Sequence, residues 1–403
     1  MRIIEVEYLG PPALGGVEAL VEALYRGFTA SGHQAEIWCT DLASFGGPRY
    51  AAGTTRINDL SVRRFPTRRV RCWPFDPHHL VWRGLDKALL AEARRGALIH
   101  LHSFPSDQVF RALRAMAAGA AVVITPHHDV ESLRRYLQLT RGKWIASRLR
   151  RAARKNPRLN VALHTEAAEK LWCEEIGWPP QQVAVIPNGV YLSEFDEITP
   201  PEVEQAVRRW PAGGIRLLFV GRLAHSKGVD LLLRALAEIP GAALLAIGPD
   251  AGAQAELKGM ARELALGSRV GFVPPPQRRE VCAAFRACDL FVLPSRYGEN
   301  FGIAAVEAMA AGKPVVASDR GGLPAVVGHG ETGLLFPGES VEGLRQALVK
   351  LIGSAPLRRS YGEAGRKKVE ASFTWERVIS RYLDLFARAC QQSNRAPGGP
   401  GNP

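Results

Sequence analysis

The sequence predicts an α/β protein built from two doubly wound parallel sheets. Short apolar runs rich in β-branched residues alternate with longer helical patterns through both halves of the chain. This alternation is typical of parallel sheets covered by helices on both faces. The chain has 403 residues, 46% of them apolar, which is enough for two or three domains. A proline- and acid-rich stretch, residues 193–214, separates the two halves and predicts the boundary between two domains.

Each half supplies the strands of one sheet. In the first half the predicted strands are residues 2–8, 35–39, 98–102, 121–125, 159–163 and 183–187. In the second half they are residues 215–220, 243–247, 270–272, 290–293 and 314–317. The predicted domains are residues 1–195 and 196–372.

The C-terminal segment follows the second sheet. Its helical pattern, residues 373–390, predicts an amphipathic helix. Residues 391–403 are rich in glycine and proline and are predicted to form a disordered tail.

Cysteine use and the N-terminal residues predict a cytoplasmic protein. The chain opens with a strand, "MRIIEVEYLG", rather than with a signal peptide, and no apolar run approaches the roughly 18 residues that a membrane span needs. The cysteines are scattered, without a C-x-x-C pair or a Cys/His cluster at ligand spacing, and are expected to be reduced and structural. They are Cys39, Cys72, Cys173, Cys282, Cys288 and Cys390.

The formal charge of +13 favours an acidic partner, which can be a nucleic acid, a membrane surface or a phosphorylated ligand. No zinc-finger spacing, RNP-like aromatic motif or basic heptad region is present, so nucleic acid is not the expected partner. Much of the excess charge lies in the first half, where ten Lys or Arg residues and no acidic residue occur between Arg134 and Arg158.

This basic segment, residues 134–158, is predicted to form a helix with Trp144, Ile145, Leu149 and Ala152 toward one face. Two interpretations remain open. In the first, the apolar stripe packs against the first sheet and leaves a solvated arginine face. In the second, the helix attaches the protein to the anionic inner leaflet of a membrane, and the acceptor is a lipid-linked or membrane-embedded glycan.

Two glutamates lie eight positions apart in the segment 294–322. On one helix they would be about 12 Å apart along the axis, too far to share a small site. We therefore expect Glu299 in a loop after a strand, and Glu307 on the second turn of a helix over residues 301–311. The first N–H groups of that helix, residues 301–303, would form an anion site between the two carboxylates.

Two cations follow another predicted strand of the second half. Arg222 comes directly after the strand 215–220, and Lys227 lies five residues further on, just before a helix. In parallel sheets ligands bind beyond the carboxyl ends of the strands. Two cations at that edge suit a diphosphate, because each can neutralise charge on its oxygens.

Two loops of the first half also lie at predicted strand ends. The stretch "LGPPALGGVEALVEAL" opens a helix at Gly15 and Gly16, where the backbone can approach a phosphate or a sugar closely. It does not match the G-x-G-x-x-G fingerprint of nicotinamide enzymes. His127 and His128 follow the strand 121–125. No D-x-D carboxylate pair that could hold a cation on a diphosphate is present, so no metal is expected.

Together these motifs resemble those of the retaining glycosyltransferases of family 4, which have the GT-B architecture. The motifs are "GGVEALVEALYRGFTASGH", "TPHHD", "VIPNGV", "VGRLAHSKGVDLLLRAL", "ENFGIAAVEAMAAGKPVVAS" and "GETGLLF". They cover nearly the whole chain, from residue 2 to about residue 390. The resemblance implies two facing Rossmann-like domains, with the helix 373–390 returning to complete the first one.

The resemblance also implies how the second domain binds a nucleoside-diphosphate sugar. Arg222 and Lys227 would hold the diphosphate, and the N–H groups around residues 301–303 would cap it. Glu307 would accept hydrogen bonds from the ribose hydroxyls. Glu299 would face the transferred sugar.

In the first domain, the resemblance implies that His127 projects toward the donor sugar and that Gly16 lies in the same cleft. The predicted catalytic residues are thus Glu299, His127, Lys227 and Arg222. The predicted donor-binding residues are Gly16, Arg222, Lys227, Asn300, Phe301, Gly302, Ile303 and Glu307.

Three positions depart from the family pattern. Tyr191 stands where aspartate is common, His164 stands where serine is frequent, and Gly248 lacks the usual second glycine after it. Because Gly248 and its neighbours shape the base pocket, the donor nucleotide is left open.

The activity implied by the resemblance is transfer of a sugar to a hydroxyl acceptor with retained configuration. Negative charge builds on the leaving diphosphate, so the two cations and the helix N-terminus are expected to carry catalysis without a metal or a cofactor. The expected acceptor is a lipid-linked or cell-surface glycan.

Three alternative functions share part of this pattern. A glycoside hydrolase could use the two glutamates as acid and base, but it would leave Arg222 and Lys227 without a role. A sugar-nucleotide epimerase can share the two-domain architecture. A non-catalytic protein could use its basic surface to bind anionic lipid or nucleic acid.

Overall fold

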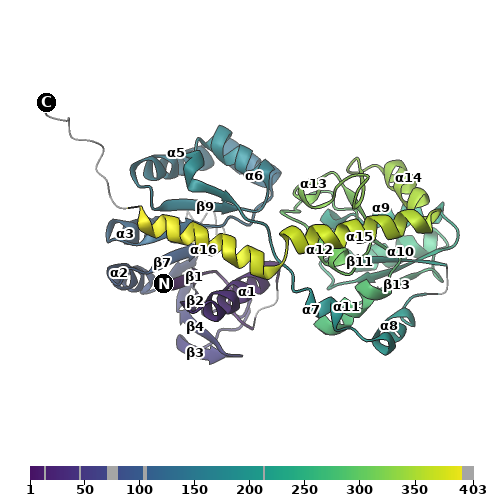
Figure 1. The fold of residues 1–403 in the computed structure, drawn as a ribbon, viewed down its shortest axis with the longest axis horizontal. Coiled ribbons are helices and arrows are strands. Elements are labelled where there is room, and N and C mark those ends of the chain that lie inside the picture. The colour runs from purple at the N-terminus through teal and green to yellow at the C-terminus, as the bar shows by residue number, and fades with distance from the viewer. Residues whose placement is uncertain (13–14, 45–46, 70–79, 103–106, 212–213, 393–403) are drawn as a thin grey trace. The chain divides into compact units, whose positions relative to one another are not determined.

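The structure is a computed structural model that describes residues 1–12, 15–44, 47–69, 80–102, 107–211 and 214–392 (Figure 1). The chain divides into two compact units. Unit 1 runs from Met1 to Pro187 and resumes at Trp375, and unit 2 spans Asn188–Thr374. Each unit is built around its own sheet and its own apolar core.

The sheet of unit 1 has the strand order β10-β9-β8-β7-β1-β2-β4-β3, with parallel neighbours except for the antiparallel pair β3 and β4. Its strands are β1 (Arg2–Val6), β2 (Gln34–Thr40), β3 (Gly53–Ile57), β4 (Leu60–Phe65), β7 (Leu98–Leu101), β8 (Ala121–Ile124), β9 (Leu159–Leu163) and β10 (Val183–Val185). A separate antiparallel pair is formed by β5 (Thr67–Arg69) and β6 (Leu80–Trp82).

Helices connect the parallel strands of unit 1. They are α1 (Gly16–Ala30), α2 (Leu85–Arg94), α3 (Asp107–Ala117), α4 (Val130–Gln138), α5 (Thr140–Lys155), α6 (Glu166–Lys170), the π-helical turn η1 (Leu171–Ile176), the 3-10 turn η2 (Pro180–Gln182) and the C-terminal α16 (Trp375–Gln391).

The sheet of unit 2 has the order β13-β12-β11-β14-β15-β16, and each pair of neighbours is parallel. Its strands are β11 (Ile215–Val220), β12 (Ala242–Ile247), β13 (Val270–Val273), β14 (Leu290–Leu293), β15 (Val315–Ser318) and β16 (Gly333–Phe336). Its helices are α7 (Ser193–Asp196), α8 (Pro200–Val207), η3 (His225–Lys227), α9 (Val229–Ala237), α10 (Gln254–Glu263), α11 (Arg278–Ala287), α12 (Ile303–Ala310), α13 (Leu323–Val326), α14 (Val341–Ile352) and α15 (Ala355–Ser372).

The strand order of each sheet reverses at one point, and this point locates the candidate sites. In unit 2 the chain runs from β11 outward to β12 and β13, then returns to β14 on the other side of β11. In unit 1 the corresponding neighbours are β1 and β7. Loops leave such a pair of strands in opposite directions, which opens a crevice at their carboxyl ends where ligands bind in open α/β sheets.

Fully buried apolar runs explain why these strands are central. Strands β7, β8, β12, β14 and β15 are buried along their whole length. A strand with both faces covered by helices shows a continuous apolar run rather than an alternating pattern. Most of the predicted strands lie where such runs occur, whereas the predicted strands β10 and β13 are half-buried.

Strands β3, β4, β5, β6 and β16 were not predicted. The first two form a hairpin-like edge in which β3 is mostly exposed and β4 alternates polar and apolar residues. Such edge strands lack the continuous apolar run on which the prediction depended. Strand β16 is only four residues long and follows a glycine-rich turn.

The domain boundaries differ from the predicted ones. Residues 188–195 belong to unit 2, because Val190 N–H donates to the carbonyl of Phe373 and Phe195 is fully buried in the core of that unit. The boundary therefore lies after Pro187 rather than after residue 195, and unit 1 resumes at Trp375. The predicted tail, residues 391–403, lies outside the described residues from residue 393 onward.

The C-terminal helix returns to unit 1, which confirms the predicted course of the chain. Helix α16 packs against α1 and β8 (Figure 1). Phe386 is fully buried, and its ring centroid lies 5.3 Å from that of Phe28 and 5.2 Å from that of His100. The helix thus covers the part of the sheet that carries the His100 ring.

The basic segment forms two helices, α4 and α5, instead of one. Ile145, Leu149 and Ala153 of α5 are buried in the core of unit 1, whereas Trp144 is 43% exposed. Of the predicted stripe, Ile145 and Leu149 therefore pack in the core of unit 1, which agrees with the first of the two interpretations, whereas Trp144 does not. The described residues contain no helix that is both long and apolar enough to span a membrane.

The described cysteines form no disulfide bonds. Burial raises the pKa of the Cys39, Cys282 and Cys288 thiols to about 12 in each case, so these thiols remain protonated at neutral pH. They behave as small apolar residues of the core. Cys72 lies outside the described residues.

The contact of α16 with the sheet predicts a large stability effect for one substitution. We expect Phe386→Ala to lower the free energy of unfolding by about 3–5 kcal/mol, because it removes a buried ring that contacts two other aromatic rings and His100. Urea unfolding followed by circular dichroism measures this loss. Val349→Ala is the control, since Val349 on α14 is exposed and should change stability by no more than about 0.5 kcal/mol. Equal effects of the two substitutions would contradict the assigned packing.

Candidate active site

Unit 2 brings Lys227 and Glu299 together at its switch point. Lys227 ends the turn that follows β11, and Glu299 lies in the loop that follows β14. Lys227 Nζ donates a hydrogen bond of 2.7 Å to Glu299 Oε2, and the two side chains are 14% and 13% exposed. Ser295 Oγ donates to the same oxygen at 2.9 Å. The two residues therefore form a partly buried ion pair at the carboxyl edge of the sheet.

Gly228 lets the two loops approach each other. It has φ of 66° and caps the N-terminus of α9. A Cβ atom at this position would lie 2.1 Å from the carbonyl oxygen of Pro294, the residue that follows β14. Only glycine adopts this positive φ without strain and avoids the clash. The close approach of the backbone carries Lys227, the preceding residue, toward the loop of Glu299.

The helix between the two glutamates begins two residues later than predicted. Helix α12 starts at Ile303, and Gly302 caps it with φ of 96°. Phe301, predicted to open the helix, instead buries its ring edge-on against Phe373 at 5.6 Å. The first-turn N–H groups therefore begin at Ile303. They still form a helix N-terminus that favours an anion next to Glu299.

Glu307 lies on α12, as predicted, and is buried against a cation that the sequence analysis missed. Burial raises the pKa of the Glu307 carboxyl, and the nearby Arg278 guanidinium offsets only part of this effect. Arg278 NH1 donates to Glu307 Oε1, and its NH2 donates to Glu194 Oε2 at 2.6 Å. Arg278 opens α11 in the stretch "PPQRREVC", which carries no spacing signal toward α12.

The remaining predicted residues divide between the two units. Arg222 follows β11 and is exposed, and Asn300 follows Glu299 in the same loop. Gly16 is the first residue of α1 in unit 1 and is exposed. His127 also belongs to unit 1 and follows β8. The predicted residues thus lie after β11, after β14 and on α12 in unit 2, and after β1 and β8 in unit 1.

Unit 1 places an unpredicted row of histidines at the carboxyl edge of its sheet. The strands β1, β7, β8 and β9 are neighbours. Glu5 lies on β1, and His102, His127 and His164 follow β7, β8 and β9. Neighbouring strands are about 4.8 Å apart, so one ring per strand can touch the next. We call these four residues the histidine row.

The four residues are joined by hydrogen bonds from end to end. His102 Nε2 lies 2.5 Å from Glu5 Oε2, and His102 Nδ1 lies 3.2 Å from His127 Nε2. His127 Nδ1 lies 3.4 Å from His164 Nε2. His164 Nδ1 lies 3.0 Å from the carbonyl oxygen of Ile186. Both ring nitrogens of His127 therefore face other histidines.

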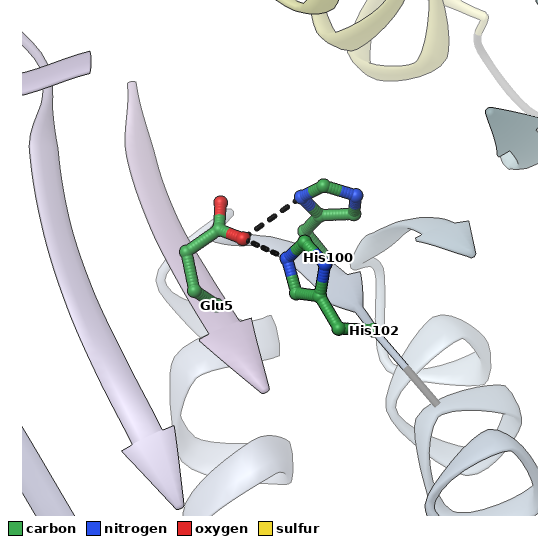
Figure 2. A group of neighbouring side chains, drawn as sticks. All are labelled: Glu5, His100 and His102. Carbon is green, nitrogen blue, oxygen red and sulfur yellow. Dashed lines mark hydrogen bonds and ion pairs between the residues drawn. The ribbon is translucent and has the colours of Figure 1, made fainter. Parts of the chain in front are cut away.

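Glu5 is anchored by a second histidine, and Figure 2 shows how both rings point at one oxygen of its carboxylate. His100 Nδ1 lies 2.9 Å from Glu5 Oε2, and His100 Nε2 lies 2.8 Å from Thr125 Oγ1. Glu5 and His100 are fully buried. Burial alone would raise the pKa of Glu5, but the attraction of His100 and the hydrogen bond of His102 outweigh it and lower the pKa to about 2.

The rings of the histidine row are neutral at ordinary pH. Burial lowers the pKa of His102 to about 4 and the pKa of His164 to about 4. Burial and the neighbouring rings hold the pKa of His127 well below its usual value of 6.5. Each ring consequently carries one proton, which it can donate through one nitrogen only.

Glu5, His100 and His102 also offer three ligand atoms that lie within 4.8 Å of one another, which raises the question of a metal ion. Ligand atoms of one metal ion each lie about 2.0–2.2 Å from it and are therefore about 3 Å or more apart. The 2.5 Å between His102 Nε2 and Glu5 Oε2 is shorter than that. The distance fits a direct hydrogen bond to a carboxylate.

Two family models match most of the chain. The model described as glycosyl transferases group 1 matches residues 202–368, and the model described as glycosyl transferase 4-like domain matches residues 15–189. The chain belongs to the glycosyltransferases of family 4. Both candidate sites described above lie within the matched residues, except that the first strand, with Glu5, precedes them.

Solved structures show that this family 4 member has the GT-B fold. Sucrose-phosphate synthase from Thermosynechococcus elongatus is 25% identical, with a TM-score of 0.76 over 97% of this chain and 100% of that one. Anabaena HepE in complex with UDP and glucose is 20% identical, with a TM-score of 0.75 over 96% of this chain and 99% of that one.

Curated relatives match over a shorter length. The D-inositol 3-phosphate glycosyltransferase of Rhodococcus erythropolis is 34% identical over 59% of this chain and 55% of its own. That of Mycolicibacterium smegmatis is 36% identical over 52% of this chain and 48% of its own. The chain thus spans about half the length of the curated relatives that it matches.

The buried rings predict that acid destabilises the protein. Between pH 6.5 and pH 4 the unfolded chain binds protons on His102 and His164 that the native state does not bind, so stability falls as the pH falls through this range. At pH 5 each ring should cost roughly 2 kcal/mol relative to pH 7.5. We expect His164→Gln, whose amide can still donate to the Ile186 carbonyl, to show a weaker pH dependence of the melting temperature. Identical pH profiles for the native protein and the variant would contradict the low pKa of His164.

Proposed function

We propose that this protein transfers a sugar from a nucleoside diphosphate to a hydroxyl acceptor, with retention of configuration and without a metal ion. The observation that carries the proposal is the partly buried ion pair of Lys227 with Glu299, which lies in the loop leading into α12, at the switch point of the sheet in unit 2. A leaving diphosphate gains negative charge in the transition state. A lysine ammonium and the helix N–H groups aimed at that position stabilise it.

Lys227 can bind a diphosphate without releasing Glu299. An ammonium group has three donors, and Glu299 Oε2 uses one of them. The ion pair then holds the cation in place before the ligand arrives, so little side-chain entropy is lost on binding. Arg222, which is exposed after β11, adds a second cation from the same edge of the sheet.

Glu307 and Arg278 support a nucleoside diphosphate as the leaving group. Glu307 Oε1 accepts from Arg278, and its second carboxylate oxygen is available for a ribose hydroxyl, the role that the family pattern implies. Structural neighbours in complex with UDP and glucose favour a nucleotide sugar as donor. The name of the curated relatives favours a hydroxyl acceptor that carries a phosphate group, which the positive net charge of this chain suits.

The proposal predicts the effect of removing the Lys227 ammonium. We expect Lys227→Ala to lower kcat by about 100- to 1,000-fold, because it removes one preorganised donor from the developing charge. Nucleotide release from UDP-, GDP- and ADP-sugars in the presence of acceptor extracts measures this, and a thermal shift with each nucleotide identifies the donor. Arg216→Ala is the matched control, since it breaks an ion pair with Asp289 at the opposite end of β11. Equal losses from the two variants would reduce Lys227 to a structural role.

We further propose that unit 1 attaches to an anionic membrane surface, with a lipid-linked glycan as acceptor and the cytoplasmic face as the place of action. The supporting feature is a groove of about 750 Å³ between α3 and α5. Its apolar part comprises Phe110, Leu113 and Trp144, and its basic part comprises Arg111, Arg114, Arg148, Arg151 and Lys155. Asp86, which is ion-paired with Arg111, also lines it. We call this the basic groove.

The chemistry of the basic groove suits a lipid headgroup. Arg148 lies over the ring of Trp144, with the guanidinium carbon 4.8 Å from the ring centroid. A tryptophan beside arginines is typical of the boundary between headgroups and acyl chains. Because the apolar stripe of α5 is buried, Trp144 and the arginines contribute the contact, and the helix itself does not insert.

The membrane proposal predicts salt-dependent binding to anionic vesicles. Each basic residue at the surface contributes on the order of 1 kcal/mol, so replacing Arg148, Arg151 and Lys155 by serine should weaken binding about 100-fold. Cosedimentation with vesicles of anionic or neutral lipid at low and high salt measures this. The control replaces the exposed Lys258, Arg262 and Lys350 of unit 2 by serine, with the same change in net charge. Equal binding to neutral and anionic vesicles would make a soluble acceptor the better proposal.

A further inference from the structure

One guanidinium serves two carboxylates in unit 2. Arg278 is the first residue of α11, Glu307 lies on the second turn of α12, and Glu194 lies on α7. Arg278 is ion-paired with both carboxylates, and no other salt bridge reaches either of them in the part of the chain that the structure describes. When all three groups are ionised, this cluster carries two negative charges and one positive charge. An ion pair that only tied helices together would have balanced charges, so the cluster has room for a further donor.

Glu194 anchors the guanidinium of Arg278. Nη2 donates to Glu194 Oε2 at 2.6 Å, and Nε lies 3.2 Å and 3.3 Å from the two oxygens of the same carboxylate. The guanidinium carbon also lies 5.7 Å from the centroid of the neighbouring Phe195 ring. Two nitrogens along one edge of a planar guanidinium fix its orientation. Nη1 remains for Glu307, to which it donates.

The Glu307 carboxylate depends on this cation. Its side chain is only 11% exposed, and burial raises the pKa of the carboxyl. The positive charge and the hydrogen bond of Arg278 lower this pKa, whereas the negative charge of Glu194 raises it. Loss of Arg278 would leave a buried carboxylate without a partner, and such a group takes up a proton.

The other elements packed against α12 supply no second cation to Glu307. Strands β14 and β15 and helix α13 contain no ionisable residue. Arg366 of α15 donates to the carbonyl oxygen of Ala310, at the C-terminal end of α12. The Cys282 thiol of α11 keeps its proton at neutral pH. Within the described residues, Arg278 is therefore the cation that faces this carboxylate.

The second oxygen of Glu307 is the one that a ligand can reach. Oε1 accepts from Arg278, whereas Oε2 has no partner among the described residues and is not fully enclosed by protein atoms. A carboxylate oxygen only accepts hydrogen bonds, so its partner must be a donor, such as a hydroxyl group. Because Arg278 holds Oε1, the direction in which Oε2 points is also fixed.

We propose that Arg278 is a positioning residue, which acts through Glu307 to give the donor site a preference for ribose over deoxyribose. This inference rests on the proposed function. Arg278 keeps Glu307 ionised and directs Oε2 toward the ribose hydroxyls, and Glu194 holds Arg278 in place. A hydroxyl group that donates to an ionised carboxylate forms a stronger hydrogen bond than one that donates to a neutral carboxyl. The charge of Arg278 therefore reaches the nucleotide through the carboxylate.

Nucleotide binding tests the preference. Calorimetric titration at pH 7.5 gives Kd for UDP, GDP and ADP and for their 2′,3′-dideoxy analogues. For the base that binds best, we expect the native protein to prefer the ribose form by about 10- to 100-fold, and Arg278→Gln to reduce this preference about tenfold. Glutamine fills much of the same space and can still donate to Glu307, but it carries no charge. Arg279→Gln is the matched control, because Arg279 is the next residue of α11 and is ion-paired with Glu202 instead. It should keep the native preference.

Further variants separate a positioning role from a general loss of structure. Arg278→Lys restores the charge and should regain most of the ribose preference. In a Glu307→Gln background, Arg278→Gln should cause no further loss, because the two residues act through one contact. In Arg278→Gln alone the preference should recover as the pH rises from 6 to 9, since Glu307 then loses its proton, and the native protein should vary less over this range.

The ionisation of Glu307 is measured without any nucleotide. ¹³C nuclear magnetic resonance of protein labelled at glutamate Cδ follows each carboxyl as the pH changes, and the signal absent from Glu307→Gln is that of Glu307. We expect its pKa to be higher in Arg278→Gln than in the native protein. In Glu194→Gln we expect the opposite shift, because the charge of Glu194 raises the pKa of Glu307.

Two results would overturn the inference. One is a Glu307 pKa that does not rise in Arg278→Gln, and the other is a ribose preference that is the same in Arg278→Gln as in Arg279→Gln. A native protein that binds none of the nucleotides would reject the proposed function. The nuclear magnetic resonance titration would still decide whether Arg278 keeps Glu307 ionised, so the two failures are distinguishable.

Discussion

Both candidate sites depend on one constraint, which is that neighbouring parallel strands end at the same edge of their sheet. Because β11 and β14 are adjacent, Lys227 and Glu299 meet at 2.7 Å although they are 72 positions apart in the sequence. Because β1, β7, β8 and β9 are adjacent, one carboxylate and three imidazoles form a continuous row. An antiparallel neighbour in either place would have carried its side chain to the opposite edge. The chemistry of both units therefore follows from strand pairing, which the buried apolar runs stabilise.

The carboxylates at these edges are compensated in different ways, and the difference matters for ligand binding. Glu299 is paired with an ammonium, and Glu307 with a guanidinium that also serves Glu194. Burying a carboxylate without such partners costs several kcal/mol. Glu5 is instead hydrogen-bonded to imidazole, and a neutral ring brings no positive charge to the row. The edge of unit 2 thus presents cations suited to a diphosphate, whereas the edge of unit 1 presents neutral rings suited to hydroxyl groups.

Packing explains why the basic residues of α5 lie at the surface. Apolar residues of helix α5 pack in the core of unit 1. Its basic residues stay at the surface, because burying a charged side chain without a partner is unfavourable. What is left on the surface is a groove in which basic side chains surround aromatic ones. This explains how a helix with a strong basic face can both support the sheet and offer a surface to an acidic partner, without containing a membrane span in its described part.

The sequence alone determined the fold class, most central strands, the loop position of Glu299 and the helical position of Glu307, because these depend on local periodicity and on distance along one helix. Local patterns also predicted that Arg222, Lys227 and His127 follow the ends of strands. They did not reveal that Arg278 contacts Glu307, or that Glu5, His102 and His164 line up with His127. Those contacts depend on which strands are neighbours, and strand order is decided by long-range packing that leaves no spacing signal in the chain. The start of α12 at Ile303 likewise had to come from the three-dimensional structure, because burial of Phe301 against Phe373 outweighed its place in the helical pattern.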